Sequence, residues 1–217
     1  LVFIDPMPSA QEIGALYTDA YAGATAGYFA KVPEKMRRAR RRARALARHA
    51  PQSADDGHRR FLDVGCNGGF MVEAARELGF SATGLDPDPV SVEWARQHYP
   101  ANHFVGGTIE DFDPGAQRFA AVYCSEVIEH APEANRFVAA VAALMAPGAT
   151  LYLTTPDIAH WRRPRDVTRW NAFAPPSHCL YFNPRNLTQL LAKHGLEVFR
   201  RRLSFKPGIK LLARRRA

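Results

Sequence analysis

Residues 61–69 read Phe-Leu-Asp-Val-Gly-Cys-Asn-Gly-Gly, and this stretch decides the fold. Its apolar beginning predicts a buried strand over Phe61–Val64. A turn rich in glycine and asparagine follows, and these are the residues that adopt left-handed backbone geometry most readily. The pattern after the turn predicts a helix over Phe70–Leu78. Such a unit lets the backbone approach a bound ligand closely, because glycine has no side chain in the way.

A second predicted strand, Ala82–Leu85, carries an acid at its end. This acid is Asp86, about one strand–helix–strand unit after Asp63. Two acids at the ends of neighbouring strands, the first beside a glycine turn, indicate a ligand of the nucleoside class.

Strand and helix patterns alternate along the middle of the chain. Further strands are expected near 104–105, at 119–124 and at 150–154, with helices at 89–98 and 132–145. This alternation predicts an α/β fold with a mostly parallel sheet and helices on both faces. In such sheets ligands bind beyond the carboxyl ends of the strands. The residues expected there are Asp63, Asp86, Thr108 to Glu110 and Cys124 to Glu126.

The two ends of the chain have patterns of their own. Ser9 and Glu12 have the spacing of a capping box, which predicts the start of a short helix. A long helix is expected from about Pro33 to His49, and a polar loop covers 51–58. Near the other end we expect a helix at 184–194. A hairpin follows, with strands at 196–205 and 209–215 joined through a Pro-Gly turn.

Composition limits the class of protein. The 217 residues are 47% hydrophobic and 23% charged, which is ordinary for one globular domain. No apolar run approaches the ~20 residues that a membrane span needs. The three cysteines have no paired spacing, which fits a reducing cytosol and predicts a cytoplasmic protein.

The net charge of +8 is unevenly distributed. Residues 31–50 carry nine Lys/Arg and one acid, and residues 200–217 carry eight Lys/Arg and no acid. Two basic segments on an acidic body can attract nucleic acid, a membrane surface or an anionic substrate. Solvated helix and strand faces are the alternative interpretation.

Residues 61–155 resemble the class I S-adenosylmethionine-dependent methyltransferases. The motifs are Phe-Leu-Asp-Val-Gly-Cys-Asn-Gly-Gly-Phe, Gly-Leu-Asp-Pro, Gly-Thr-Ile-Glu-Asp and Ser-Glu-Val-Ile-Glu-His, in that order. The last is similar to a segment of ubiquinone-type O-methyltransferases. The opening Leu-Val-Phe-Ile-Asp-Pro-Met-Pro-Ser resembles sugar and natural-product methyltransferases. The resemblance implies a Rossmann-like sheet of seven strands, mostly parallel, whose last strand is antiparallel.

The resemblance also implies a site for the methyl donor, S-adenosylmethionine, and for its product S-adenosylhomocysteine. Asp63 suits the ammonium group, backbone N–H groups of the glycine turn suit the carboxylate, and Asp86 suits the ribose hydroxyls. The predicted donor-binding residues are Asp63, Gly65, Cys66, Asn67, Gly69, Asp86, Pro87, Thr108, Ile109, Glu110, Cys124 and Ser125.

Several alternatives compete with these assignments. Asp63 and Asp86 can be helix caps, and Cys124 can be a small core residue. A nicotinamide dehydrogenase shares the architecture, but its Gly-x-Gly-x-x-Gly spacing is absent here. The distance from the glycine turn to Asp86 fits both classes and does not separate them.

The acceptor side of the site is predicted from the segment Ala-Pro-Pro-Ser-His-Cys-Leu-Tyr-Phe. A hydroxyl acceptor benefits from a base, and His178 and His130 are the candidates. Trp170 and Tyr181 are predicted to line the substrate pocket; both can equally belong to the core. The Glu-x-x-Glu-His segment is tied to a divalent metal in ubiquinone-type enzymes, but it also occurs without metal, and we predict no metal here.

The predicted organisation is an N-terminal helical segment, 1–52, that covers the donor site, and a class I methyltransferase domain, 53–217. We expect methyl transfer to a hydroxyl group of a small-molecule acceptor. This acceptor can be anionic. The alternative is a methyltransferase or binder that acts on nucleic acid through the basic segments. The acceptor and the oligomeric state do not follow from the sequence.

Overall fold

The computed structural model describes residues 1–9, 12, 31–52 and 59–216. The predicted contacts of a capping box are present between Ser9 and Glu12. Ser9 Oγ accepts from the Glu12 N–H (3.2 Å), and Glu12 Oε2 accepts from the Ser9 N–H (2.8 Å). The body of the helix predicted there lies outside the described residues.

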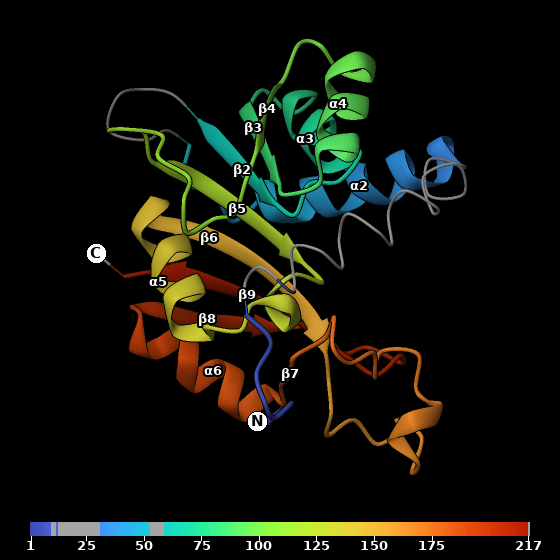
Figure 1. The fold of residues 1–217 in the computed structure, drawn as a ribbon. Coiled ribbons are helices and arrows are strands. Elements are labelled where there is room, and N and C mark those ends of the chain that lie inside the picture. The colour runs from blue at the N-terminus through green and yellow to red at the C-terminus, as the bar shows by residue number, and fades with distance from the viewer. Residues whose placement is uncertain (10–11, 13–30, 53–58, 217) are drawn as a thin grey trace.

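Seven strands form one sheet in the order β4-β3-β2-β5-β6-β9-β8 (Figure 1). The strand pairs from β4 to β6 are all parallel, and β9 is antiparallel to both β6 and β8. The predicted fold class, with its antiparallel last strand, is therefore confirmed. The strands are β2 (Arg60–Val64), β3 (Ser81–Asp86), β4 (His103–Gly106), β5 (Phe119–Ser125), β6 (Met145–Pro156), β8 (Leu196–Arg201) and β9 (Gly208–Arg215).

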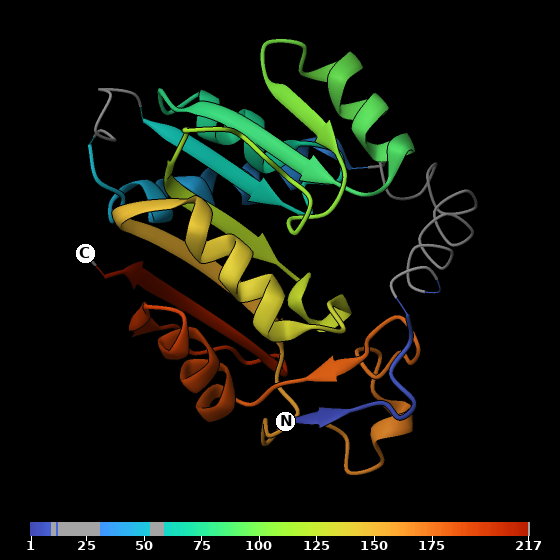
Figure 2. The same ribbon diagram turned by 60° about the vertical axis from the view of Figure 1, so that its left-hand side comes forward.

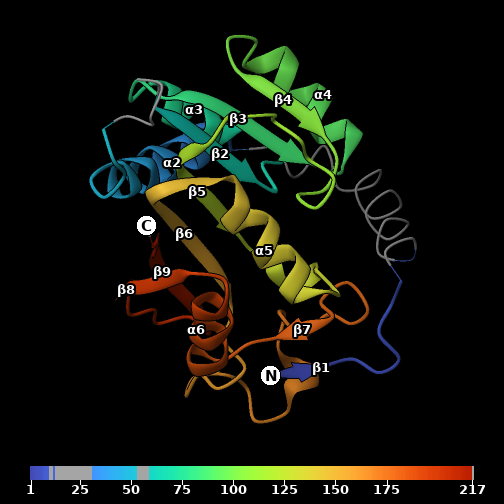
Figure 3. The same cartoon turned by 90° about the vertical axis from the view of Figure 1, so that its left-hand side faces the viewer.

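Helices cover both faces of this sheet, as Figures 2 and 3 show. One hydrophobic cluster packs α2 (Val32–Ala47), α3 (Phe70–Arg76) and α4 (Pro89–His98) against one face. The other packs α5 (Ala134–Leu144) and α6 (Pro184–Lys193) against the opposite face. Two short 3₁₀ turns, η1 (Ile128–His130) and η2 (Val167–Arg169), lie in the connections.

Helix α2 shows how a very basic segment joins the core. Its buried residues are Met36, Ala39, Ala43 and Leu46, spaced three or four apart on one face. The small alanines let the helix lie close to α3 and the sheet, while the arginines remain on the other faces. The predicted apolar stripe is therefore the side that packs.

The starts of two helices resolve the capping alternatives. Asp88, not Asp86, is the N-cap of α4, since its carboxylate accepts from the N–H groups of Val90 and Ser91. Helix α3 begins after Gly69 with no side-chain cap, so Asp63 does not cap it. Both strand-end acids are thus left for another role.

Two features near the chain ends differ from the predicted pattern. The strand β1 (Val2–Phe3) pairs antiparallel with β7 (Leu180–Tyr181), a contact between segments too short to show a strand pattern (Figure 3). Strand β8 ends at Arg201, whereas we expected it to continue to Phe205. A register shift at Val198/Arg200 weakens its pairing with β9, and β8 lies at the edge of the sheet with no second partner.

No helix among the described residues is long and apolar enough to cross a membrane.

Candidate active site

A cavity of about 1000 Å³ opens at the carboxyl ends of the parallel strands. Its walls come from the ends of β2, β3 and β5, from the turn after each of them, and from α2. The predicted topology thus places the first residues of three neighbouring turns around one space, the arrangement expected for ligand binding in such a sheet.

The glycine turn after β2 forms the floor of this cavity. Gly65 has φ 74° and Asn67 has φ 44°, so both adopt left-handed geometry. A Cβ on Gly65 would lie 2.5 Å from Cγ2 of Val127, so only glycine fits there. Asn67 takes the position where glycine was expected, and its Oδ1 accepts from the Gly68 N–H at 2.6 Å. Asparagine therefore keeps the turn geometry.

Asp86, at the end of β3, is bound from two sides. Oδ2 accepts from the Asn67 N–H at 2.7 Å, and Oδ1 accepts from the Asp88 N–H at 2.9 Å. Burial raises the pKa of Asp86 to about 6, and the two backbone hydrogen bonds oppose this rise. The carboxylate joins the two turns and lines the cavity. Each oxygen retains a second lone pair that can accept from a ligand hydroxyl.

Asp63, at the end of β2, is 2% exposed and lines the same cavity. Burial raises its pKa well above the usual range, the nearby charge of Asp86 raises it further, and Arg42 opposes the shift. No hydrogen-bond partner for Oδ1 exists among the described residues. Buried polar atoms are seldom left unpaired, so this oxygen indicates a ligand group that donates.

Arg42 was not predicted as a site residue. It projects from α2, lines the cavity, and donates from Nη1 to the Tyr123 hydroxyl at 2.6 Å. Tyr123 stacks on Tyr152 with ring centroids 5.2 Å apart, which fixes the acceptor of this bond. Residues 31–50 contain nine Lys/Arg and no signal that selects one of them, so only the packing of α2 identifies Arg42.

The opposite wall contains the residues predicted for the nucleoside base. Pro87, Thr108, Ile109 and Glu110 all line the cavity. The Thr108 hydroxyl donates to Asp111 Oδ2 at 2.8 Å, and Ile109 is 3% exposed. This wall is therefore apolar on its face with polar groups at its rim, as a purine requires. Cys66 and Ser125 complete the set of predicted donor residues that line the cavity.

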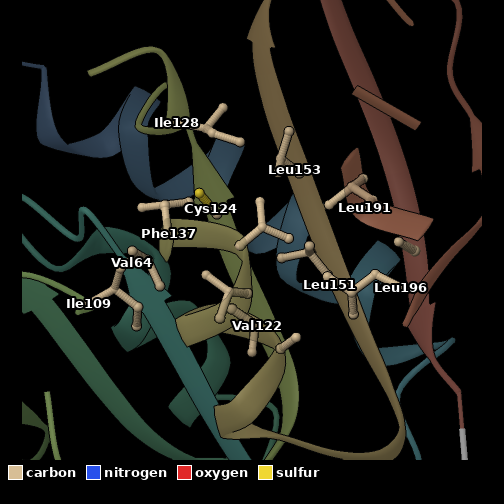
Figure 4. Packing of buried hydrophobic residues seen from close by; sticks show 14 of the residues in the cluster. Val64, Ile109, Val122, Cys124, Ile128, Phe137, Leu151, Leu153, Leu191 and Leu196 are labelled. Carbon is tan, nitrogen blue, oxygen red and sulfur yellow. The ribbon is translucent and has the colours of Figure 1, made fainter. Parts of the chain in front are cut away.

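Four predicted site residues do not line the cavity. Figure 4 shows Cys124 inside the apolar cluster that includes Ile128 and Phe137, where it is 0% exposed. The structure therefore favours the core interpretation of Cys124. Gly69 supports the turn from behind, since a Cβ there would lie 2.7 Å from the Phe104 ring.

The two aromatic residues that were predicted to line the acceptor pocket also lie outside the cavity. Trp170 is 8% exposed and Tyr181 is 1% exposed. The Tyr181 hydroxyl accepts from the Ala174 N–H at 3.2 Å, and its ring stacks on Phe173. Both residues shape the loop that carries His178. They are therefore supports of the acceptor region in this structure, and sequence pattern could not separate that role from contact.

The two predicted histidines meet at the cavity. The rings of His130 and His178 pack edge to face with centroids 4.5 Å apart. His130 Nδ1 lies 2.7 Å from the Ser177 carbonyl, and His178 Nδ1 lies 2.8 Å from the Ala172 carbonyl. A carbonyl only accepts, so each Nδ1 carries the proton and each Nε2 is the basic nitrogen.

Both histidines are neutral at ordinary pH. Burial and the adjacent His178 together lower the pKa of His130 to about 4, although the hydrogen bond with the Ser177 carbonyl opposes the shift. Burial also lowers the pKa of His178, with the Ala172 carbonyl opposing the shift. Of the two, His178 keeps the higher basicity that proton transfer needs.

Two acids stand behind these histidines. Glu126 has φ 59°, and its Oε1 accepts from the Thr154 hydroxyl at 2.7 Å. Glu129 is 0% exposed, and its Oε2 accepts from the Thr155 hydroxyl at 2.9 Å. Burial, with the charge of Glu126, raises the pKa of Glu129 to about 8. Glu129 therefore holds a proton at neutral pH.

A carboxylate oxygen of Glu129 and one ring nitrogen each of His130 and His178 lie within 4.8 Å of one another. This grouping has the donor types that a divalent cation accepts. The sequence-based expectation that no metal is used stays a prediction.

Comparison with known proteins identifies the family. Residues 28–200 match the methyltransferase domain family. The chain belongs to this family. A relative, the ubiquinone biosynthesis O-methyltransferase of Xanthomonas campestris pv. campestris (strain B100), is 39% identical over 103 residues, which cover 44% of this chain and 42% of that protein. The chain thus spans less than half the length of this curated relative. The predicted family, the methyltransferases, is confirmed.

Solved structures share the fold of this methyltransferase domain. The Burkholderia thailandensis 1,6-didemethyltoxoflavin-N1-methyltransferase, with bound 1,6-didemethyltoxoflavin and S-adenosylhomocysteine, has a TM-score of 0.68 at 18% identity and covers 100% of this chain and 95% of that one. A [4+2]-cyclase has a TM-score of 0.71 at 15% identity, with 100% of both chains covered. The second neighbour shows that this fold alone does not fix the reaction.

Proposed function

We propose that this protein transfers the methyl group of S-adenosylmethionine to a small-molecule acceptor, and that the acceptor atom is a hydroxyl oxygen. The observation that carries the proposal is the cavity in which Asp63 and Asp86 lie on neighbouring strand ends and which Arg42 also lines. S-adenosylmethionine supplies an electrophilic methyl group on its sulfonium.

The residues of the cavity fit the donor. The unpaired Oδ1 of Asp63 suits the ammonium group, and ionisation of Asp63 is favoured when a cation binds. Arg42 and the backbone N–H groups of the glycine turn suit the carboxylate. Asp86 suits the ribose hydroxyls, since it lines the cavity and each of its oxygens retains a second lone pair. Pro87 and Ile109 supply the apolar wall for adenine.

His178 is proposed as the base that receives the acceptor proton at Nε2. Its ring lines the cavity, and the Ala172 carbonyl fixes its tautomer. His130 is proposed to hold the acceptor against this nitrogen, because its lower pKa makes it the weaker base. Hydroxyl methylation is also the activity named for the ubiquinone biosynthesis relative.

An anionic acceptor is the class that the charges favour. Lys35, Arg38 and Arg136 line the cavity besides Arg42, from α2 and α5. Cations on two opposite walls lower the energy of a bound anion. Glu110, Glu126 and Glu133 also line the space, so the preference concerns a localised carboxylate or phosphate on the acceptor and not a highly charged polymer.

The N-terminal segment, 1–52, is proposed to close the donor site above the methyltransferase domain, 53–217. Its described part already contributes Met7, Pro8, Ser9 and four residues of α2 to the cavity wall. We also propose that the protein works in the cytoplasm, since its three free cysteines are buried and unpaired.

Calorimetric titration with S-adenosylhomocysteine tests the donor site. Wild-type protein is expected to bind it, and Asp86→Ala is expected to weaken binding at least about 100-fold, since two hydroxyl contacts to a charged group are lost. Asp113→Ala, an exposed acid outside the cavity, is the matched control and keeps wild-type affinity. Equal affinity of Asp86→Ala and wild type refutes the proposed donor site.

A further inference from the structure

Two loops present large apolar side chains to solvent at one end of the molecule. Trp161 is 80% exposed in the loop after β6, while Leu203 and Phe205 are 104% and 81% exposed in the loop between β8 and β9. These are the most exposed large hydrophobic residues of the described chain. Exposed apolar residues that cluster in this way mark an interaction surface.

The two loops are joined to each other. The Nε2 of His160 donates to the Ser204 carbonyl at 3.0 Å, and its Nδ1 accepts from the Arg162 N–H at 3.1 Å. The loop between β8 and β9 is closed at its base by the Arg202 N–H, which donates to the Lys210 carbonyl at 2.8 Å. Both loops lie beyond the arrowhead of β6 in Figure 1. The exposed apolar residues of the two loops thus belong to one surface, which these hydrogen bonds fix in place.

This surface is surrounded by cations. The Arg162 guanidinium lies 5.4 Å from the centre of the Trp161 ring. Residues 200–210 contain five Lys/Arg and no acid. Of these, Arg202 and Lys206 flank Leu203 and Phe205 directly and are exposed.

The fold extends this positive region across the molecule. Lys210 has its pKa lowered by burial and by the charges of Arg42, Arg202 and Arg41, so α2 and the last hairpin lie within electrostatic reach. On the same hairpin, Phe199 contacts the His49 ring at 5.4 Å, and Arg214 covers Phe199 at 4.9 Å. The two basic segments of the sequence are therefore brought close together by the fold.

We propose that Trp161, Leu203 and Phe205 insert into the headgroup region of an anionic lipid bilayer, with the surrounding arginines and lysines against its phosphates. Tryptophan and phenylalanine beside leucine, ringed by cations, is the composition of surfaces that lie in a membrane interface. Leu203 is fully exposed, so its transfer from water into an apolar medium lowers the free energy by the largest amount that its side chain allows. Single-stranded nucleic acid instead stacks its bases on aromatic rings and gains nothing from Leu203.

The position of this surface relates it to the cavity. Strand β6 ends at Pro156 beside Gly208 of β9, so both loops leave the sheet at the edge where the parallel strands end. The cavity opens at this same edge. Membrane docking would therefore bring the catalytic edge of the sheet near the bilayer. The proposal does not depend on the proposed methyl transfer, because lipid binding is measured without donor or acceptor.

Sedimentation with phosphatidylcholine vesicles, with and without phosphatidylglycerol, tests the proposal on the whole chain. Wild-type protein is expected to bind the anionic vesicles and not the neutral ones, with a blue shift of tryptophan fluorescence that Trp161→Phe removes. The variant Leu203→Ser/Phe205→Ser is expected to lower the partition coefficient roughly tenfold or more, given the apolar area withdrawn from water. Arg202→Glu/Lys206→Glu is expected to abolish binding at near-physiological salt.

Matched controls separate local from general effects. Val90→Ser changes an exposed apolar residue on α4, and Arg118→Glu reverses a charge before β5 at the opposite edge of the sheet. Both are expected to keep wild-type vesicle binding. The proposal is overturned if wild type ignores anionic vesicles, or if the apolar variant binds as well as wild type. It is also overturned if an RNA oligonucleotide binds more tightly than the vesicles and its binding falls with the same loop substitutions.

Discussion

The proposed donor half and the proposed acceptor half of the cavity are built in different ways. Donor-facing groups come from the ends of adjacent parallel strands, each a few residues after an apolar run. The groups proposed to face the acceptor come from η1 and from the irregular segment between β6 and β7. These two segments meet where His130 contacts Ser177, 47 residues further along the chain. The first half follows from local pattern, and the second from how distant segments pack.

This difference explains what the sequence could predict. Asp63, Asp86 and the turn between them are positioned by strand registry, because Asp63 lies opposite Gly84 on β3 and the turn bonds back to Asp86. Any sequence that forms these strands must bring them together. Their placement could therefore be predicted once the strands were recognised.

The acceptor half could be predicted only in part. His130 and His178 were chosen for their chemistry, and the structure brings them together. Trp170 and Tyr181 were chosen by composition, and they pack into the supporting loop instead, because an aromatic ring serves a core as well as a pocket. Arg42 was missed, since nothing in a row of arginines shows which one points inward until α2 is docked.

The largest effect is expected on the acceptor side. His178→Ala should lower kcat about 10²–10³-fold, because a positioned base contributes this much to a proton transfer. Donor affinity in a calorimetric titration should not change. His194→Ala changes a histidine that is bonded to Asn135 at the end of α6, outside the cavity, and as the control it should keep wild-type turnover. Unchanged turnover of His178→Ala would show that the two halves do not divide the work in this way.

A smaller effect is expected from Asp63→Asn on the donor side. This substitution should increase the stability of the ligand-free protein and weaken donor binding. The substitution removes a buried charge, so above the raised pKa of Asp63 the ligand-free protein should gain about 1–3 kcal/mol, the cost of burying such a group unpaired. As the pH falls below that pKa, wild-type Asp63 takes up a proton, and the gain should shrink until it vanishes near the ordinary pKa of aspartate. Thermal melts across pH measure this, and donor binding should weaken in the same variant. A loss of stability at every pH would contradict the account.

The pH dependence of donor binding should sharpen the same contrast. Burial raises the pKa of Asp86 to about 6 and also raises the pKa of Asp63, so both take protons as the pH falls and S-adenosylmethionine should bind progressively less tightly. Affinity should therefore rise with pH through this range. The rise should be shallower in Asp63→Asn, since one of the two groups no longer titrates. An affinity that increases as the pH falls would place the donor against other groups.

Arg42→Ala should weaken S-adenosylhomocysteine binding about tenfold, which is the scale of one charge-assisted hydrogen bond. Arg44→Ala on the exposed side of α2 is the matched control and should change nothing. If both variants bind equally well, α2 covers the donor site without contacting the ligand.

Removal of metal is expected to have no effect. Turnover should be the same before and after EDTA, since the proposed proton transfer needs only the neutral His178 as base and His130 to hold the acceptor. A loss of turnover that Mg²⁺ restores would instead assign Glu129, His130 and His178 to a cation.

A crystal structure with bound S-adenosylhomocysteine tests the central claim most directly. The account predicts the ribose hydroxyls on the Asp86 carboxylate and the amino group within hydrogen-bond distance of Asp63 Oδ1. A nucleoside bound elsewhere, or one whose amino group points away from Asp63, would contradict it.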